Sequence, residues 1–429
     1  MPALPLAACT LPLYLIVPTY YTENLGLSLA LVGQILLIIR LLDAVTDPLI
    51  GYLADQAPAR YGRRRSVFLI AIPLLAVSAW MLFRPGDTAT PFHLFFWSFL
   101  LSLGYTAVSL SYSAWGAELA SGYQARTRVT AAREVAIVTG TLIATAMPAI
   151  AASVDPETAN RTALAWLAIF LVILLPSSAF LVALCLPEPR NRSWSETTNS
   201  VRSTIVSMVR NKPFRRLLFA FFINGLANGL PATLFLFFVS ERLLAEDLRG
   251  PFLLAYFAAG VISVPVWMRL ATKTSKHTAW CTSMMLATTV FIFVPFIQPE
   301  FAWTFYIVCV LTGAAVGADL FLPASIQADV IDIDTAESGV QRSGSYFAAW
   351  AFATKLALGV AIGIAFPALA FFGFDAEAEI QTPQASWALA LIYAWVPVVL
   401  KIPAIWLMWS FPLDRSRQEA LQRKIEQSA

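Results

Sequence analysis

The sequence predicts an all-α membrane protein with twelve transmembrane helices in two six-helix bundles. Of its 429 residues, 58% are hydrophobic and only 13% are charged, whereas about a quarter are charged in an average soluble domain. Apolar segments of about 20 residues recur along the chain, and that length lets an α-helix cross about 30 Å of hydrocarbon. We expect spans at residues 4–22, 29–54, 66–83, 92–116, 131–152, 162–187, 214–239, 251–271, 278–297, 301–325, 345–372 and 386–411.

The basic residues predict the orientation of these spans. Of the 29 lysines and arginines, 22 fall in the connections after every even-numbered span and in the tail, and only four fall in the opposite loops. Because cytoplasmic loops are enriched in these residues, both termini are expected in the cytoplasm, with the protein in a bacterial inner membrane. The net charge of +3 needs no nucleic-acid partner. The first apolar segment has no cleavage-like end, so no separate signal peptide is expected.

A polar, basic stretch divides the chain into two halves. Residues 188–213 are expected to form a cytoplasmic linker with a surface-lying helix at 200–210. The division gives bundles at 1–187 and 214–411 and a cytoplasmic tail at 412–429. Two six-span halves suggest a repeat with the substrate site between them, and we expect a monomer. The chain opens at MPALPLAAC with almost no leader, which is compatible with a truncated start.

Charged residues interrupt the second span. Asp43 and Asp47 are four residues apart and therefore lie on one helix face. A charge at the centre of a bilayer costs about 3 kcal/mol or more, so such acids need a partner or a polar cavity. Two close carboxylates bind a proton or a cation, to which Thr46 can add a hydroxyl. Arg40 is the expected counter-ion, and a purely structural Arg40–Asp43 ion pair is the alternative.

The turn after the second span carries a recognisable motif. GYLAD at 51–55 and RYGRRR at 60–65 resemble the signature of the major facilitator superfamily. The stretches YYTENLGLS and RLLDAVTDPLIGYLAD (20–28 and 40–55), SYSAWGAELASGYQARTRVTAAREV (111–135) and QADVIDIDTAESGVQRSGSYFAAWAFATKLALG (327–359) resemble the glycoside–pentoside–hexuronide:cation symporter family. This resemblance runs along nearly the whole chain and implies the major facilitator fold.

The family resemblance implies a cation site. It assigns the cation ligands to Asp43, Asp47, Thr46 and Thr106, and a coupling lysine to Lys355. Thr46 stands where the best-known member of the family has an asparagine, so both Na⁺ and H⁺ remain open as the coupling ion. No cofactor is implied, and no metal beyond a transported Na⁺. An isolated lysine in an apolar helix also needs an acid, and Asp43 or Asp47 is the expected partner.

The sugar-binding residues of the family are only partly retained. Its two sugar-binding acids align with Ala7 and Ser109, and its stacking tryptophan aligns with Ser113, with Trp115 nearby. Tyr105 is retained, and Arg133 resembles the family's arginine in span 5. Further candidates for a substrate site are polar residues inside the second half: Asn224, Asn228 and Asp319. For these three, helix-to-helix hydrogen bonding is the structural alternative.

Charged residues at the cytoplasmic span ends are expected to form a gate. The group comprises Asp55, Arg63, Arg64 and Arg126, with Asp329, Asp332 and Arg342 in the loop between spans 10 and 11. The acids of that loop are expected to pair with the basic turns of the other half.

These features predict a cation-coupled symporter of a small organic solute, such as a sugar, glycoside or uronate. A lysolipid or amphipathic-anion transporter is the alternative substrate class. A non-transporting membrane receptor or scaffold is the alternative from another class. The sequence contains no phosphate-binding glycine loop, zinc-ligand spacing or nucleophile–base motif, so an enzyme is not expected.

Overall fold

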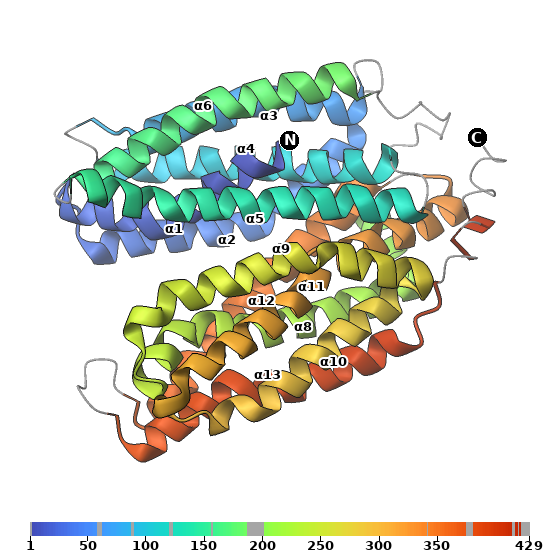
Figure 1. Cartoon of the computed structure of the whole chain (residues 1–429). Helices are drawn as coiled ribbons and strands as arrows, with labels where there is room; N and C mark the ends of the chain where they lie inside the picture. Colours follow the sequence, from blue (N-terminus) through green and yellow to red (C-terminus); the bar gives the residue numbers. More distant parts are fainter. Residues whose placement is uncertain are drawn as a thin grey trace.

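A computed structural model describes residues 2–57, 62–86, 90–119, 123–155, 158–186, 201–340, 342–374, 381–413, 417–418 and 420–421. These residues form helices and short connections and contain no strand. The helices lie in two groups, one from each half of the chain (Figure 1). The predicted all-α class and the major facilitator architecture are confirmed.

The first group contains six helices from the N-terminal half: α1 (Ala3–Glu23), α2 (Leu29–Gln56), α3 (Arg63–Phe83), α4 (Pro91–Leu119), α5 (Tyr123–Val154) and α6 (Ala159–Cys185). The short α7 (Val201–Arg210) follows, where the sequence predicted a linker helix. The second group contains α8 (Lys212–Phe237), α9 (Arg249–Lys273), α10 (Lys276–Phe293), α11 (Phe305–Ser338), α12 (Ser343–Phe371) and α13 (Pro383–Trp409).

Most of these helices can cross a membrane. Ten helical segments of the described chain are long and apolar enough to do so, and they include α3 to α6 and α8 to α13. The protein is therefore an integral, multi-pass membrane protein. Membrane crossing by α1 and α2, which would complete the count of twelve, stays a prediction.

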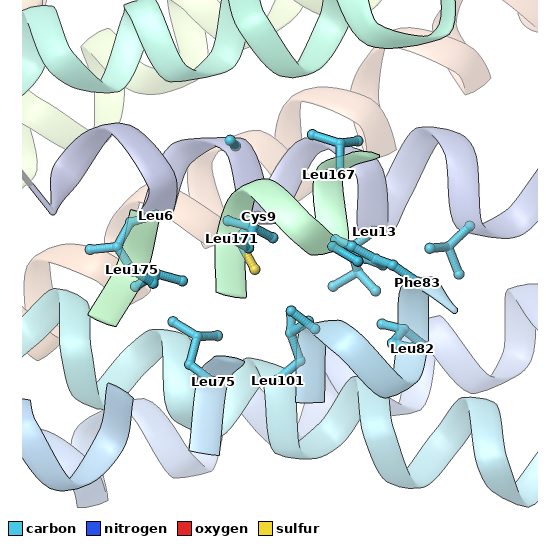
Figure 2. Close-up of a cluster of buried hydrophobic side chains, with 14 of the residues drawn as sticks. Leu6, Cys9, Leu13, Leu75, Leu82, Phe83, Leu101, Leu167, Leu171 and Leu175 are labelled. Carbon is cyan, nitrogen blue, oxygen red and sulfur yellow. The ribbon is translucent and has the colours of Figure 1, made fainter. Parts of the chain in front are cut away.

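The core of the first bundle comes from regular apolar spacing. Leu167, Leu171 and Leu175 recur every four residues along α6, which places them on one helix face. They face leucines of α1, α3 and α4 around the buried Cys9 (Figure 2). Cys281 and Cys309 are also buried, whereas Cys185 is exposed.

Two helices extend beyond their predicted spans at the end expected to be cytoplasmic. Helix α5 begins at Tyr123 instead of residue 131, and α11 continues to Ser338 instead of ending at 325. The acids expected in a loop are therefore inside the last turns of α11. The helix can continue because Asp329, Asp332 and Asp334 each have a basic partner.

Glycines allow the two bundles to approach each other between α2 and α12. A Cβ atom added to Gly51 would lie 2.6 Å from the Cβ of Ala348 and 2.8 Å from the carbonyl oxygen of Gly344. Neither distance is tolerable, so only glycine fits at position 51 while the helices cross this closely. Small residues permit such close helix packing in membranes.

Gly51→Val is therefore expected to prevent close contact between α2 and α12. A cysteine placed at Ala348, with the exposed Cys185 replaced by serine, should react faster with a maleimide in the Gly51→Val background. Gly33→Val on the same helix is the control, because nothing lies within 4 Å of a Cβ there. Equal reaction rates in both backgrounds would contradict this packing argument.

Candidate functional site

Two ladders of polar residues face each other inside the first bundle. Asp43 and Asp47 on α2 are only 2% and 1% exposed. Ser102 and Thr106, also four residues apart, present hydroxyls from α4. The Thr106 hydroxyl donates to Asp47 Oδ1 over 2.8 Å, and the Ser102 hydroxyl donates to Asp43. Equal spacing on two packed helices lets each hydroxyl meet one carboxylate.

The basic partner of this carboxylate pair comes from the other bundle. Lys355 on α12 places its Nζ 2.6 Å from Asp47 Oδ2 and 3.2 Å from Asp43 Oδ2. Two carboxylates and one ammonium leave an excess of one negative charge. The Lys355 side chain is 29% exposed, whereas those of the acids are nearly covered. Carboxylate and hydroxyl oxygens are ligands that small hard cations prefer, so the cluster can hold one cation.

The predicted cation-site residues are only partly brought together. Asp43, Asp47, Thr106 and Lys355 meet, as expected. Thr46 is half-buried one residue before Asp47 and therefore points in another direction around α2. Arg40 is exposed, and Lys355 forms ion pairs with both carboxylates. Sequence reasoning missed Ser102, although its spacing of four from Thr106 repeats that of the two acids.

A second group of polar residues lies on α4 and α5. Tyr105 and Ser109 are half-buried on α4, and Arg133 and Glu134 form an ion pair on α5. The guanidinium of Arg133 donates to Glu134 Oε1 from Nε over 3.1 Å and from Nη2 over 2.7 Å. Sequence reasoning did not single out Glu134, which directly follows the arginine that it neutralises.

Trp115, the tryptophan near Ser113 in the sequence, does not form an open platform. Ser113 is half-buried, but Trp115 is only 1% exposed and packs edge-to-face against Phe68 in the bundle core. Ala7, which aligns with an acid of the family, is buried. The sugar-binding pattern of the family is therefore not rebuilt at these positions by neighbouring side chains.

A third polar cluster connects four helices inside the second bundle. Lys401 on α13 is 4% exposed, and its Nζ lies 2.7 Å from the side-chain oxygens of both Asn224 and Asn228 on α8. Asn228 Nδ2 in turn donates to Asp319 Oδ2 on α11 over 2.9 Å. Trp280 on α10 donates to the other oxygen of Asp319. The amide of Asn228 thus lies between a buried lysine and a partly buried carboxylate.

Charged residues close the two bundles against each other at the end expected to be cytoplasmic. Arg126 on α5 is ion-paired with Asp332 and, over 3.2 Å, with Asp329 of α11. Nζ of Lys276 on α10 lies 2.5 Å from Oδ2 of the same Asp329. Gln418 of the tail donates to Asp332 over 2.6 Å. Sequence reasoning found Arg126 and the acids but missed Lys276 and Gln418.

A carboxylate of the first bundle caps a helix of the second. Asp55 at the end of α2 accepts hydrogen bonds from the backbone N–H groups of Gly344 and Ser345 over 2.8 and 2.7 Å. These groups belong to the first turn of α12, whose own N-cap residue provides no side-chain bond. A negative charge there also interacts favourably with the helix dipole.

Arg64 holds the capping carboxylate within the first bundle, and Arg63 and Arg64 share Glu118. Arg64, which is completely buried, lies 2.7 Å from both Asp55 and Glu118, and Arg63 lies 3.2 Å from Glu118. Glu118 was not identified from the sequence. Arg342 was expected to be part of the gate between the bundles. Instead it pairs with Asp334 over 3.0 Å within its own bundle and also contacts Ser207 of α7.

The fold and these paired charges across two six-helix bundles define a transporter of the major facilitator type. The family model described as "MFS/sugar transport protein" matches residues 1–415, and the chain belongs to this family. It is thus a transport protein and not an enzyme.

Curated relatives include the mouse sodium-dependent lysophosphatidylcholine symporter 1, which is 26% identical and matches over 92% of this chain and 82% of its own length. YagG of Escherichia coli K12, named as a proposed glycoside/cation symporter, is 24% identical over 95% of this chain and 89% of its own length. A bacterial homologue of the iron transporter ferroportin in an outward-facing state shares the fold with a TM-score of 0.72 at 13% identity. That match covers 96% of this chain and 97% of the other.

Removing Arg126 is expected to weaken closure between α5 and α11. Arg126→Gln leaves Asp332 without its arginine, and breaking a buried pair in this way costs about 3–5 kcal/mol. The melting temperature of the purified protein should fall. Arg128→Gln is the matched control, because Arg128 is exposed on the same helix. A fall of the same size in both variants would contradict the assignment.

Lys401 and Asp319 are expected to be energetically coupled through Asn228. Lys401→Met and Asp319→Asn should each lower the melting temperature, because each leaves one buried charge uncompensated. In the double variant, the melting temperature should fall by clearly less than the sum of the falls in the two single variants. Purely additive losses would show that the two charges do not compensate each other.

Proposed function

We propose that this protein is a cation-coupled symporter that moves a small organic solute by alternating access. The observation that carries this proposal is the position of Lys355. It comes from one bundle and occupies both carboxylates of a buried acid pair in the other. Transporters of this architecture move their two halves around a site between them. An ion that competes with Lys355 for the acids therefore changes a contact between the halves.

The proposed coupling begins with exchange at the acid pair. A cation that enters between Asp43 and Asp47 neutralises the excess negative charge and weakens, without removing, the attraction of the two acids for Lys355. Solute then binds nearby, and each ligand raises the affinity for the other by the same factor. The hydroxyls of Ser102 and Thr106 supply oxygens that a bound Na⁺ needs and a proton does not, which favours Na⁺ over H⁺.

The proposed substrate is a sugar or glycoside. The description of the family and the name of YagG support this class. In the first bundle, the proposed substrate contacts are Tyr105, Ser109, Ser113 and Arg133. In the second bundle, they are Asn224, Asn228 and Asp319. A lysolipid is the second candidate, because the mouse relative is named for lysophosphatidylcholine symport and the family's sugar-binding acids are replaced here. A receptor without transport is disfavoured by membership in a family of transporters.

The proposed gate is the set of contacts at the linker end of the bundles. Opening that end must separate Arg126 from Asp329 and Asp332, and Asp55 from α12. Arg63 and Arg64 hold Asp55 and Glu118, while Arg342 fixes the end of α11. We place this end in the cytoplasm, with both termini, in a bacterial inner membrane. The proposed units are the bundles 1–187 and 214–411, the linker 188–213 and the tail 412–429, in a monomer.

Asp47→Asn and Lys355→Ala are each expected to abolish cation-driven solute uptake into vesicles while leaving the amount of protein in the membrane unchanged. The first removes a cation ligand, and the second uncouples the acid pair from the other bundle. Uptake of radiolabelled sugars, glycosides, uronates and lysolipids, with Na⁺ and pH gradients imposed separately, measures this effect and identifies the ion.

The control variant is Asp155→Asn, which removes a carboxylate that is exposed outside the cluster. It should retain uptake. Wild-type uptake rates in both Asp47→Asn and Lys355→Ala would overturn the proposed function.

A further inference from the structure

Three charged clusters inside the bundles nearly balance their own charges. The acid pair and Lys355 carry an excess of one negative charge, which one monovalent cation removes. Lys401 and Asp319 have opposite charges and are linked through Asn228. Arg133 and Glu134 form the third cluster. With a cation bound at the acid pair, these three clusters together have no net charge.

Glu134 holds its charge against Arg133 by an uncommon local contact. Neighbouring residues of a helix normally point in different directions, so the two side chains must bend toward each other to meet. The Nε and Nη2 atoms of Arg133 both donate to Oε1 of Glu134. The side chains of Arg133 and Glu134 are only 15% and 13% exposed. Charge-assisted contacts of this kind are strong when they are shielded from water. The guanidinium is thus already neutralised before any solute arrives.

Helix α4 connects this pair to the cation cluster. Thr106 on this helix donates to Asp47. Tyr105 directly precedes Thr106, and Ser109 comes three residues after it. Helix α4 in turn packs against α5, because a Cβ atom added to Gly116 of α4 would lie 3.4 Å from Val129, one turn before Arg133. A solute bound between the proposed contacts Tyr105 and Arg133 therefore lies near both charged clusters.

We infer that Glu134 is a specificity-determining residue that restricts the solute to molecules without net charge, by neutralising the Arg133 guanidinium beside the proposed solute site. This inference rests on the proposed symport. An anionic solute would bring back an uncompensated charge in the membrane interior, which is costly. An anion that pairs with Arg133 must share the guanidinium with Glu134, and two carboxylates against one guanidinium leave a buried negative charge uncompensated. Neutral glycosides and zwitterionic headgroups fit, whereas uronates and anionic lysolipids do not.

The test compares pairs of solutes that differ mainly in charge. Uptake into vesicles is measured for methyl glucoside against glucuronate, and for lysophosphatidylcholine against lysophosphatidylglycerol, under the gradient that drives transport. The wild-type protein should accumulate the net-neutral member of a pair at least tenfold better. Glu134→Gln frees the positive charge of Arg133 and should shift that ratio at least tenfold toward the anionic member.

Two further variants separate charge selection from a structural role. Arg133→Gln/Glu134→Gln removes both charges and should return the ratio toward the neutral member, even if total uptake is lower. Glu134→Asp should keep the wild-type preference. Glu246→Gln is the matched control, because Glu246 pairs with Arg249 over 2.6 Å at an exposed position outside the bundles.

The outcomes distinguish this inference from the proposed function. Wild-type preference for the anionic members, or a ratio unchanged in Glu134→Gln, would overturn the inference and leave symport standing. If the double variant keeps the anionic preference of Glu134→Gln, charge balance is not the cause and the inference also fails. If neither pair accumulates under Na⁺ or pH gradients, the proposed function fails and takes the inference with it.

Discussion

The ion pair between Lys355 and the two carboxylates of α2 is the interaction on which the rest of the structure depends. Asp43 and Asp47 are almost fully covered, and charges in such surroundings persist only with partners. The hydroxyls of α4 satisfy one oxygen of each acid, and the lysine of α12 satisfies the other. Because those helices belong to different bundles, the electrostatic requirement of one small cluster fixes how the halves meet near the middle of the molecule.

Each polar cluster provides partners for its buried charges in a different way. Arg133 and Glu134 are neighbours in sequence and balance within one helix, whereas Lys401 and Asp319 balance through an amide across three helices. Of the three clusters described here, the acid pair with Lys355 carries an excess of one negative charge. This excess charge is why we propose the acid pair as the cation site.

The sequence predicted the all-helical bundles and the acid pair, because apolar length and buried carboxylates leave few alternatives. It did not predict Ser102, since serines are common in helices and only the partner helix shows which one matters. Glu134 was missed beside Arg133 because adjacent helical residues rarely meet. The acids of α11 were assigned to a loop, because their partners Arg126 and Lys276 are distant in sequence and only the fold brings them there.

The capping of α12 by Asp55 has a consequence for the opposite conformation. The first turn of α12 takes its cap from the other bundle, so its amide groups lose that acceptor whenever the bundles separate at this end. Water or local unwinding must then satisfy them. A protein group therefore caps α12 only while the two bundles are in contact at this end, so each opening exposes these amides and each closure covers them again.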